Sequence, residues 1–151
     1  MEDIEGPARE LASALEVALP EWVERCVEQR YRAAVGEPPA SVVDAARAAG
    51  EAARADVAPR VRALLEADID QQWTTPLSLL RSAVRYPTRV LADAAVPPVP
   101  RAAFEEERFP DDVYDLTPAT FSDIGERVGG TAIVWGAAKA WAHRHRHGGL
   151  T

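Results

Sequence analysis

The sequence predicts an all-α protein, an irregular bundle of five or six helices with proline kinks. Apolar residues recur three and four positions apart through most of the chain, which is the spacing of one face of a helix. Ala, the strongest helix former, supplies 29 of the 151 residues. No segment alternates apolar and polar residues with the period of a strand. The length fits one domain, and we expect residues 1–151 to form it, with the proline-rich linker 96–100 inside.

The first predicted helix has an apolar residue at every fourth position: Leu11, Leu15, Leu19, Val23, Val27 and Tyr31. Pro20 interrupts this pattern, and we expect a kink or a break near residues 16–20, because proline lacks the amide hydrogen and clashes with the preceding turn. Gly36 and the following prolines end the helix. Ser41 is the expected N-cap of a second helix, which Pro59 kinks or restarts.

The second half is predicted to contain shorter helices. Thr75-Pro76 is a helix start signal, and Pro87 should bend the chain after it. A short helix is expected over about 101–108, and Thr117-Pro118 should open a helical turn around Phe121. We expect a loop at Gly129-Gly130 and a last helix from Thr131. Its expected buried side is Ile133, Val134, Ala137, Ala138, Trp141 and Ala142.

The charge of the chain argues against nucleic acid and anionic membranes as general partners. The net charge is −7, and the acidic residues gather in 1–37 and 101–128, whereas 129–151 is basic. Arginine outnumbers lysine sixteen to one, and alanine is abundant. Since alanine and arginine have GC-rich codons, we infer a high-GC bacterial source.

A cytoplasmic location is the expectation from two further features. Cys26 is the only cysteine, so no disulfide can form within the chain. The first residues lack the basic and apolar regions of a signal peptide, and no apolar run approaches the ~18 residues of a membrane helix.

The residues that enzymes and cofactors require are largely missing. All three histidines, His143, His145 and His147, lie close together near residue 151, where a rigid catalytic set is difficult to build. The zinc-protease, serine-hydrolase, P-loop and dinucleotide-binding motifs are absent. We therefore expect no cofactor and favour a protein that is not an enzyme.

The segment 104–123 has the most distinctive composition, because acidic and aromatic residues alternate on a proline-stiffened frame. One interpretation is a docking surface, with aromatic anchors and with aspartates that pair with arginines of a partner. Its candidate residues are Phe109, Asp111, Asp112, Tyr114, Asp115 and Phe121. A divalent metal on the three aspartates is a second interpretation. In the third, the aromatics fill the core and the aspartates cap turns.

Three weaker candidates remain. Arg81, Arg85 and Arg89 recur every four residues and would form an anion-binding stripe or a solvated helix face. His143 and His147 have the spacing of two metal ligands on a helix, although two ligands make only an adventitious site. The four tryptophans are expected in the core.

The C-terminal half also resembles a known family. The phrase Phe109-Pro110-Asp111-Asp112-Val113-Tyr114-Asp115-Leu116-Thr117-Pro118 and the later Trp135-Gly136-Ala137-Ala138-Lys139-Ala140 are similar to a family of small actinobacterial proteins whose activity is uncharacterised. The resemblance agrees with a high-GC source and implies no activity, cofactor or site residue.

These observations predict a non-enzymatic protein–protein interaction or regulatory module. Its partner is an unknown protein, or a second copy through surplus apolar helix surface. The alternative is a helical small-molecule-binding protein or enzyme, with a pocket between helices lined by tryptophans and by Arg81, Arg85 and Arg89.

Overall fold

The computed structural model describes residues 5–66 and 76–147, and these residues form helices and no strand. Six segments are helices of six residues or more, and a seventh, α6, is a single turn of four residues. The prediction of an all-α bundle of five or six helices is therefore confirmed. The segments are α1 (Glu5–Ala34), α2 (Ala40–Glu66), α3 (Pro76–Ser82), α4 (Arg85–Asp93), α5 (Ala103–Arg108), α6 (Phe121–Ile124) and α7 (Glu126–His147).

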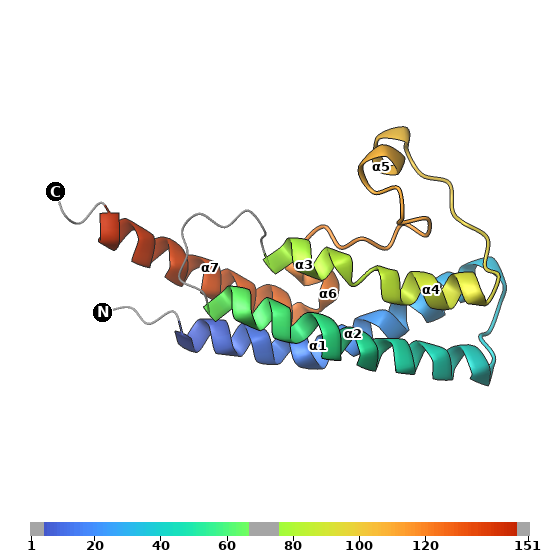
Figure 1. Ribbon diagram of the computed structural model, residues 1–151, viewed down its shortest axis with the longest axis horizontal. Coiled ribbons are helices and arrows are strands. Elements are labelled where there is room, and N and C mark those ends of the chain that lie inside the picture. The colour runs from blue at the N-terminus through green and yellow to red at the C-terminus, as the bar shows by residue number, and fades with distance from the viewer. Residues whose placement is uncertain (1–4, 67–75, 148–151) are drawn as a thin grey trace.

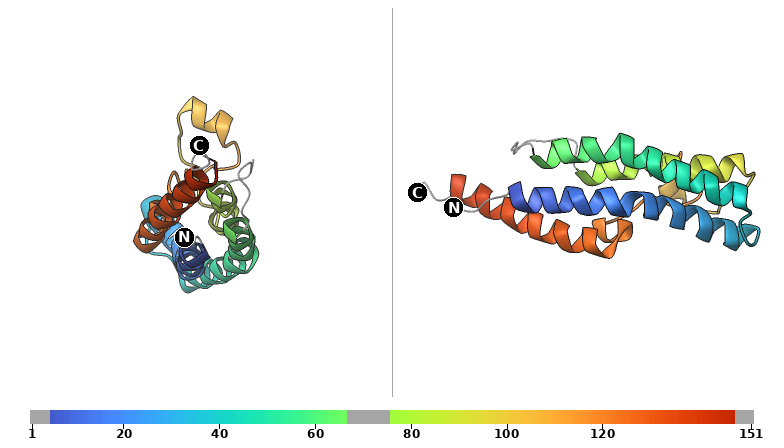
Figure 2. Two further views of the ribbon diagram at one scale, coloured as in Figure 1. Left: turned by 90° about the vertical axis from the view of Figure 1, so that its left-hand side faces the viewer. Right: turned by 90° about the horizontal axis from the view of Figure 1, so that it is seen from below.

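Two long helices organise the structure. α1 and α2 form an antiparallel hairpin, α3 and α4 follow one another along it, and α7 packs against α1 (Figure 1). Figure 2 shows α7 and α2 on opposite sides of α1. α5 stands away from the bundle on an excursion of the chain between α4 and α6 (Figure 1). No helix of the described ranges is long and apolar enough to cross a membrane.

The hydrophobic core runs along the bundle as two clusters. The larger cluster joins α1 to the second half of α2 and to α3, α6 and α7, and Trp22 and Leu19 are among its buried residues. The smaller cluster joins the end of α1 to the start of α2, to α4 and to Tyr114. Ala49 of α2 packs against both clusters, so they meet at that point.

Of the kink or break expected near residues 16–20, the break is wrong, because α1 continues through Pro20 to Ala34, and the kink stays a prediction. α2 likewise continues through Pro59. Each proline removes one backbone hydrogen bond, but the long contact between the two helices holds both in helical conformation across the gap. The expected N-cap of the second helix, Ser41, is also wrong, because α2 begins at Ala40. The Pro39 carbonyl accepts hydrogen bonds from the amides of Val42 and Val43, so the helix starts before Ser41.

Pro87 divides the following helical region as expected, but the division precedes it. α3 ends at Ser82 and α4 begins at Arg85. Between them the chain makes tighter hydrogen bonds, from the Ala83 amide to the Leu80 carbonyl and from the Tyr86 amide to the Ala83 carbonyl. The ring of Pro87 would clash with the Ala83 carbonyl in a continuous α-helix. The α-helical hydrogen-bond pattern is therefore interrupted between α3 and α4.

The loop expected at Gly129-Gly130 is also wrong, because α7 begins at Glu126 and passes through both glycines. Gly129 is buried, and a Cβ atom at this position would lie 2.1 Å from Ser122 Oγ and 3.0 Å from its Cα. The glycine pattern that resembled a loop therefore reflects the close approach of α6 to α7.

The buried side of α7 differs from the expected one. Val128 is fully buried, and Trp135 packs half-buried against the larger core cluster. Of the residues expected inside, Ala138 is buried, but Ile133 and Val134 are 73% and 53% exposed. α7 is apolar on most of its circumference, so periodicity could not show which side faces α1.

Candidate interaction surfaces

Asp112, one of the predicted docking residues, is instead part of the interior. Its residue exposure is only 3%, and it is a buried charged residue of the described chain. The carboxylate accepts hydrogen bonds from the amides of Leu116 and Thr117, both at 2.8 Å, and from the Thr117 hydroxyl at 2.5 Å. Asp112 thus holds the turn that returns the chain to the bundle, which is the structural interpretation of this aspartate.

Tyr114 is also buried, at 2% exposure, as the largest side chain of the smaller core cluster. Its hydroxyl donates a 2.7 Å hydrogen bond to the Val96 carbonyl, and burial raises the pKa of the phenol. Phe121 is half-buried against the larger cluster. These two aromatics anchor the 112–124 segment to the bundle, so their rings are not a continuous exposed surface.

The other predicted docking residues are accessible. Asp111 and Asp115 are exposed, and Asp115 has a left-handed backbone conformation with φ of 57°. Phe109 is half-buried beneath the Arg108 guanidinium, which lies 5.1 Å from the ring centre. Docking through these three residues stays a prediction.

A polar recess lies between this segment and the bundle. Its volume is about 170 Å³. Arginines from two parts of the chain line it: Arg81 belongs to α3, whereas Arg101 precedes α5 and Arg108 ends α5. The charged residues that line the recess are Arg81, Arg101, Arg108, Glu105, Asp112 and Asp115. Phe109, Asp112, Asp115 and Arg81 are candidates from the sequence, whereas Arg101, Arg108 and Glu105 are not, because no regular spacing connects these three.

Two of these arginines secure the excursion. Arg101 donates from Nη1 to the Phe109 carbonyl at 2.6 Å. Arg81 donates from Nε to the Pro118 carbonyl at 3.2 Å and from Nη2 to the Ala119 carbonyl at 3.4 Å. Two residues that line the recess are therefore held by hydrogen bonds to the backbone of the excursion.

The structure does not bring together the predicted arginine stripe. Arg81 lies on α3 and points to the 118–119 backbone, whereas Arg85 and Arg89 lie on α4. The cause is the change of register before Pro87, which rotates the second helix relative to the first.

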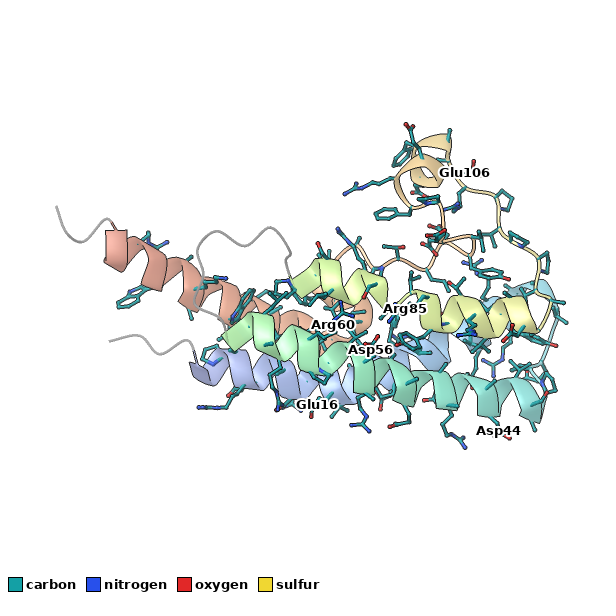
Figure 3. All side chains as sticks on the ribbon, in the orientation of Figure 1. Glu16, Asp44, Asp56, Arg60, Arg85 and Glu106 are labelled. Atoms are coloured by element: carbon teal, nitrogen blue, oxygen red, sulfur yellow. The ribbon has the colours of Figure 1, made fainter. Side chains whose placement is uncertain are left out.

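Arg85 belongs to a polar cluster between α4 and α2. Asp56 accepts hydrogen bonds from the Tyr86 hydroxyl, at 2.6 Å, and from Arg85, and Arg60 lies 3.7 Å from its other oxygen. Figure 3 shows Arg60 and Arg85 beside Asp56. The Tyr86 hydrogen bond and the neighbouring guanidinium lower the pKa of Asp56, although burial opposes them. The cluster joins α2 to α4, and both oxygens of the Asp56 carboxylate have a partner.

Cys26 lies in α1, and burial raises the pKa of its thiol to about 12. A thiol of this kind stays protonated and is a poor nucleophile or metal ligand at neutral pH.

No group of three or more histidine, cysteine, aspartate or glutamate side chains in the described part of the chain could hold a metal ion. The side chains of His143 and His147 lie outside the described residues, so that candidate site stays a prediction.

A second surface follows the outer side of α7. Here a groove of about 520 Å³ is lined mainly by apolar residues, and Pro7 of α1 closes one side. The α7 residues at the groove are Ile133, Val134, Ala137, Ala138, Trp141 and Arg144. Trp141 had been expected in the core, but it is half-buried at this groove. Trp22 is buried as expected, whereas Trp73 lies outside the described residues.

Comparison of the chain with protein-family models, with curated proteins and with solved structures finds no match.

Proposed function

We propose that this chain is a non-enzymatic protein-interaction module that binds a second copy of itself through α7. The observation that supports this proposal is the exposed apolar side of that helix. Ile133 is 73% and Val134 is 53% exposed, and both line the groove beside Pro7. Exposed β-branched residues that line one groove are typical of a surface that another helix covers.

The arrangement of residues on this side favours a second copy. Glu126 and Arg144 are both exposed and are about five turns apart, at ~3.6 residues per turn, so they lie in line on one side of α7. Ile133 and Ala137 lie between them on the same side. Glu126 and Arg144 are equally far from Trp135 along the chain, and so are Ile133 and Ala137.

An antiparallel second α7 would therefore present complementary groups. Glu126 of one copy would face Arg144 of the other, and Ile133 would face the small Ala137. The same relationship would occur twice, as twofold symmetry requires. Small residues at the crossing allow two helices to pack closely. The charges of this chain thus complement themselves, and no different partner is needed to explain the surface.

The test is the oligomeric state of the purified chain, measured by light scattering and sedimentation across a range of concentrations. We expect a dimer. Glu126→Arg and Arg144→Glu should each weaken dimerisation by about tenfold or more, because each variant places like charges opposite one another. The double variant Glu126→Arg/Arg144→Glu should restore the dimer, since the opposite charges face one another again.

A matched pair of variants separates this surface from general surface hydrophobicity. Ile133→Glu should produce a monomer. Val35→Glu replaces another exposed apolar residue, which is 59% exposed and lies after the end of α1, and should leave the dimer intact. A wild-type chain that is monomeric at every concentration overturns the proposal. So does a double variant that remains as weakly associated as the single ones.

The alternative, a small-molecule-binding protein, is retained as a second candidate because of the polar recess at α5. The pocket would not be the one expected from the sequence, since among the described residues neither Arg85, Arg89 nor a tryptophan lines the recess.

A further inference from the structure

Six arginines of α1, α2 and α4 make ion pairs with carboxylates: Arg32, Arg47, Arg54, Arg60, Arg62 and Arg85. In residues 5–66 and 76–147, no such pair within 4.0 Å involves Arg81, Arg101 or Arg108. In a chain of net charge −7, three arginines that make no ion pair with the described residues thus line one recess.

The carboxylates at the recess do not neutralise these arginines directly. The Asp112 carboxylate is enclosed, and both of its oxygens accept hydrogen bonds from the 116–117 turn. Glu105 and Asp115 line the recess but make no ion pair with these three arginines among the described residues.

The donors of the arginines are partly used and partly free. The hydrogen bonds of Arg101 to carbonyls use Nη1, so Nε and Nη2 make no hydrogen bond to the described residues. Those of Arg81 use Nε and Nη2, so Nη1 remains. Arg108 contacts the Phe109 ring through its face, which leaves the N–H groups at the guanidinium edge. Planar forks of N–H groups are the donors that bind carboxylate and phosphate oxygens best.

We infer that this recess is a binding site for a small oxyanion, a phosphate or carboxylate group held by Arg81, Arg101 and Arg108. The volume of about 170 Å³ admits a small molecule rather than a peptide or a nucleotide. Arg81 and Arg101 are held in place by the backbone of residues 109–119, so two of the three donors are already ordered before the anion arrives. Glu105 and Asp115 disfavour anions of high charge and accept hydrogen bonds from hydroxyl or amino groups of the same molecule.

The experiment is a titration of the ¹⁵N-labelled chain by NMR, at constant ionic strength, with inorganic phosphate in one series and succinate in another. We expect saturable shifts for the amides of 105–119 and for the arginine Nε–H signals of Arg101 and Arg108. The series with the lower dissociation constant identifies which oxyanion the site prefers. Acetamide serves as the uncharged probe and should cause no saturable shift.

Arg108→Gln is the informative variant, because Arg108 is exposed and stacks on Phe109 without holding the backbone. It should weaken binding of the preferred anion by about tenfold, as expected for loss of one charged hydrogen-bond donor. Arg89→Gln removes the same charge from an exposed position on α4 outside the recess and should leave binding unchanged.

Two results overturn the inference. One is the absence of saturable shifts in both anion series. The other is an equal loss of binding in Arg89→Gln and Arg108→Gln, which would show attraction to the net charge alone. Neither result depends on the oligomeric state of the chain, so this test and the test of dimerisation fail separately.

Discussion

Gly50 of α2 lies directly against the backbone of Pro20 in α1. A Cβ atom at Gly50 would be 2.9 Å from the Pro20 carbonyl oxygen and 3.0 Å from its Cα. The two helices thus pack backbone against backbone where Pro20 lacks an amide hydrogen and Gly50 lacks a side chain. Glycine is required at this contact because of the limited space, since Gly50 has an ordinary helical backbone.

Gly50→Ala should therefore destabilise the chain by about 1–3 kcal/mol, because the added methyl group meets backbone that cannot move aside. The gain of up to about 1 kcal/mol from higher helix propensity is smaller. Gly136→Ala is the control, since a Cβ atom there meets nothing within 4 Å and should stabilise α7. Urea unfolding of both variants measures the difference. Equal stability of the two variants would contradict the close approach.

Asp112→Asn should cost about 1–3 kcal/mol of stability. The amide nitrogen cannot accept the hydrogen bonds that one carboxylate oxygen now accepts, so a partly buried donor of Leu116 or Thr117 loses its partner. Asp111→Asn, at the exposed neighbour, should change the free energy of unfolding by less than about 0.5 kcal/mol. Thermal or urea unfolding compares the two. A similar effect in both would contradict the structural role of Asp112.

The difference between buried Asp112 and exposed Asp111 also decides how docking through the 104–123 segment should be tested. Charge reversal at Asp111, Asp112 and Asp115 together would unfold the turn as well as alter the surface. Reversal at Asp111 and Asp115 alone keeps the buried carboxylate. The double variant should keep the melting temperature within a few degrees, which differential scanning fluorimetry can check, and any partner lost from it was bound by the exposed carboxylates.

The Asp56 cluster should give α2 and α4 a contact that depends on pH. The folded state lowers the pKa of Asp56 below its ordinary value of 3.8, chiefly through the Tyr86 hydroxyl. The contribution to stability is thus fully present above the ordinary value and is lost as the pH falls through the folded one. The stability difference between wild type and Asp56→Asn should shrink below about pH 4. Denaturant unfolding across pH 2–7 measures it, and a difference that persists at the acidic end would contradict the assignment.

Cys26 should resist thiol reagents while the chain is folded. Burial raises its pKa to about 12, so the reactive thiolate is scarce at about pH 8. A colourimetric disulfide reagent should react slowly with the native chain and rapidly in guanidinium chloride, where the thiol regains its ordinary pKa. Fast labelling of the native chain, at the rate seen after denaturation, would contradict the burial.

The contrast between sequence and structure is clearest in α7. The sequence determined that this segment is a helix and that it is apolar, because alanine content and the absence of strand periodicity suffice for both. It did not determine that Ile133 and Val134 face outward, because nearly every side of the helix is apolar. Only the docking of Val128 and Trp135 against α1 decided the orientation.

The same division applies to the candidate sites. The sequence by itself determined the all-α class and the distinctive character of 104–123, since both follow from local composition and spacing. Tertiary structure alone decided that Asp112 and Tyr114 turn inward, that Arg81 separates from Arg85, and that Arg101 and Arg108 join it at one recess. The physical reason is that burial and the meeting of distant charges depend on how helices pack, and neighbours along the chain do not encode that packing.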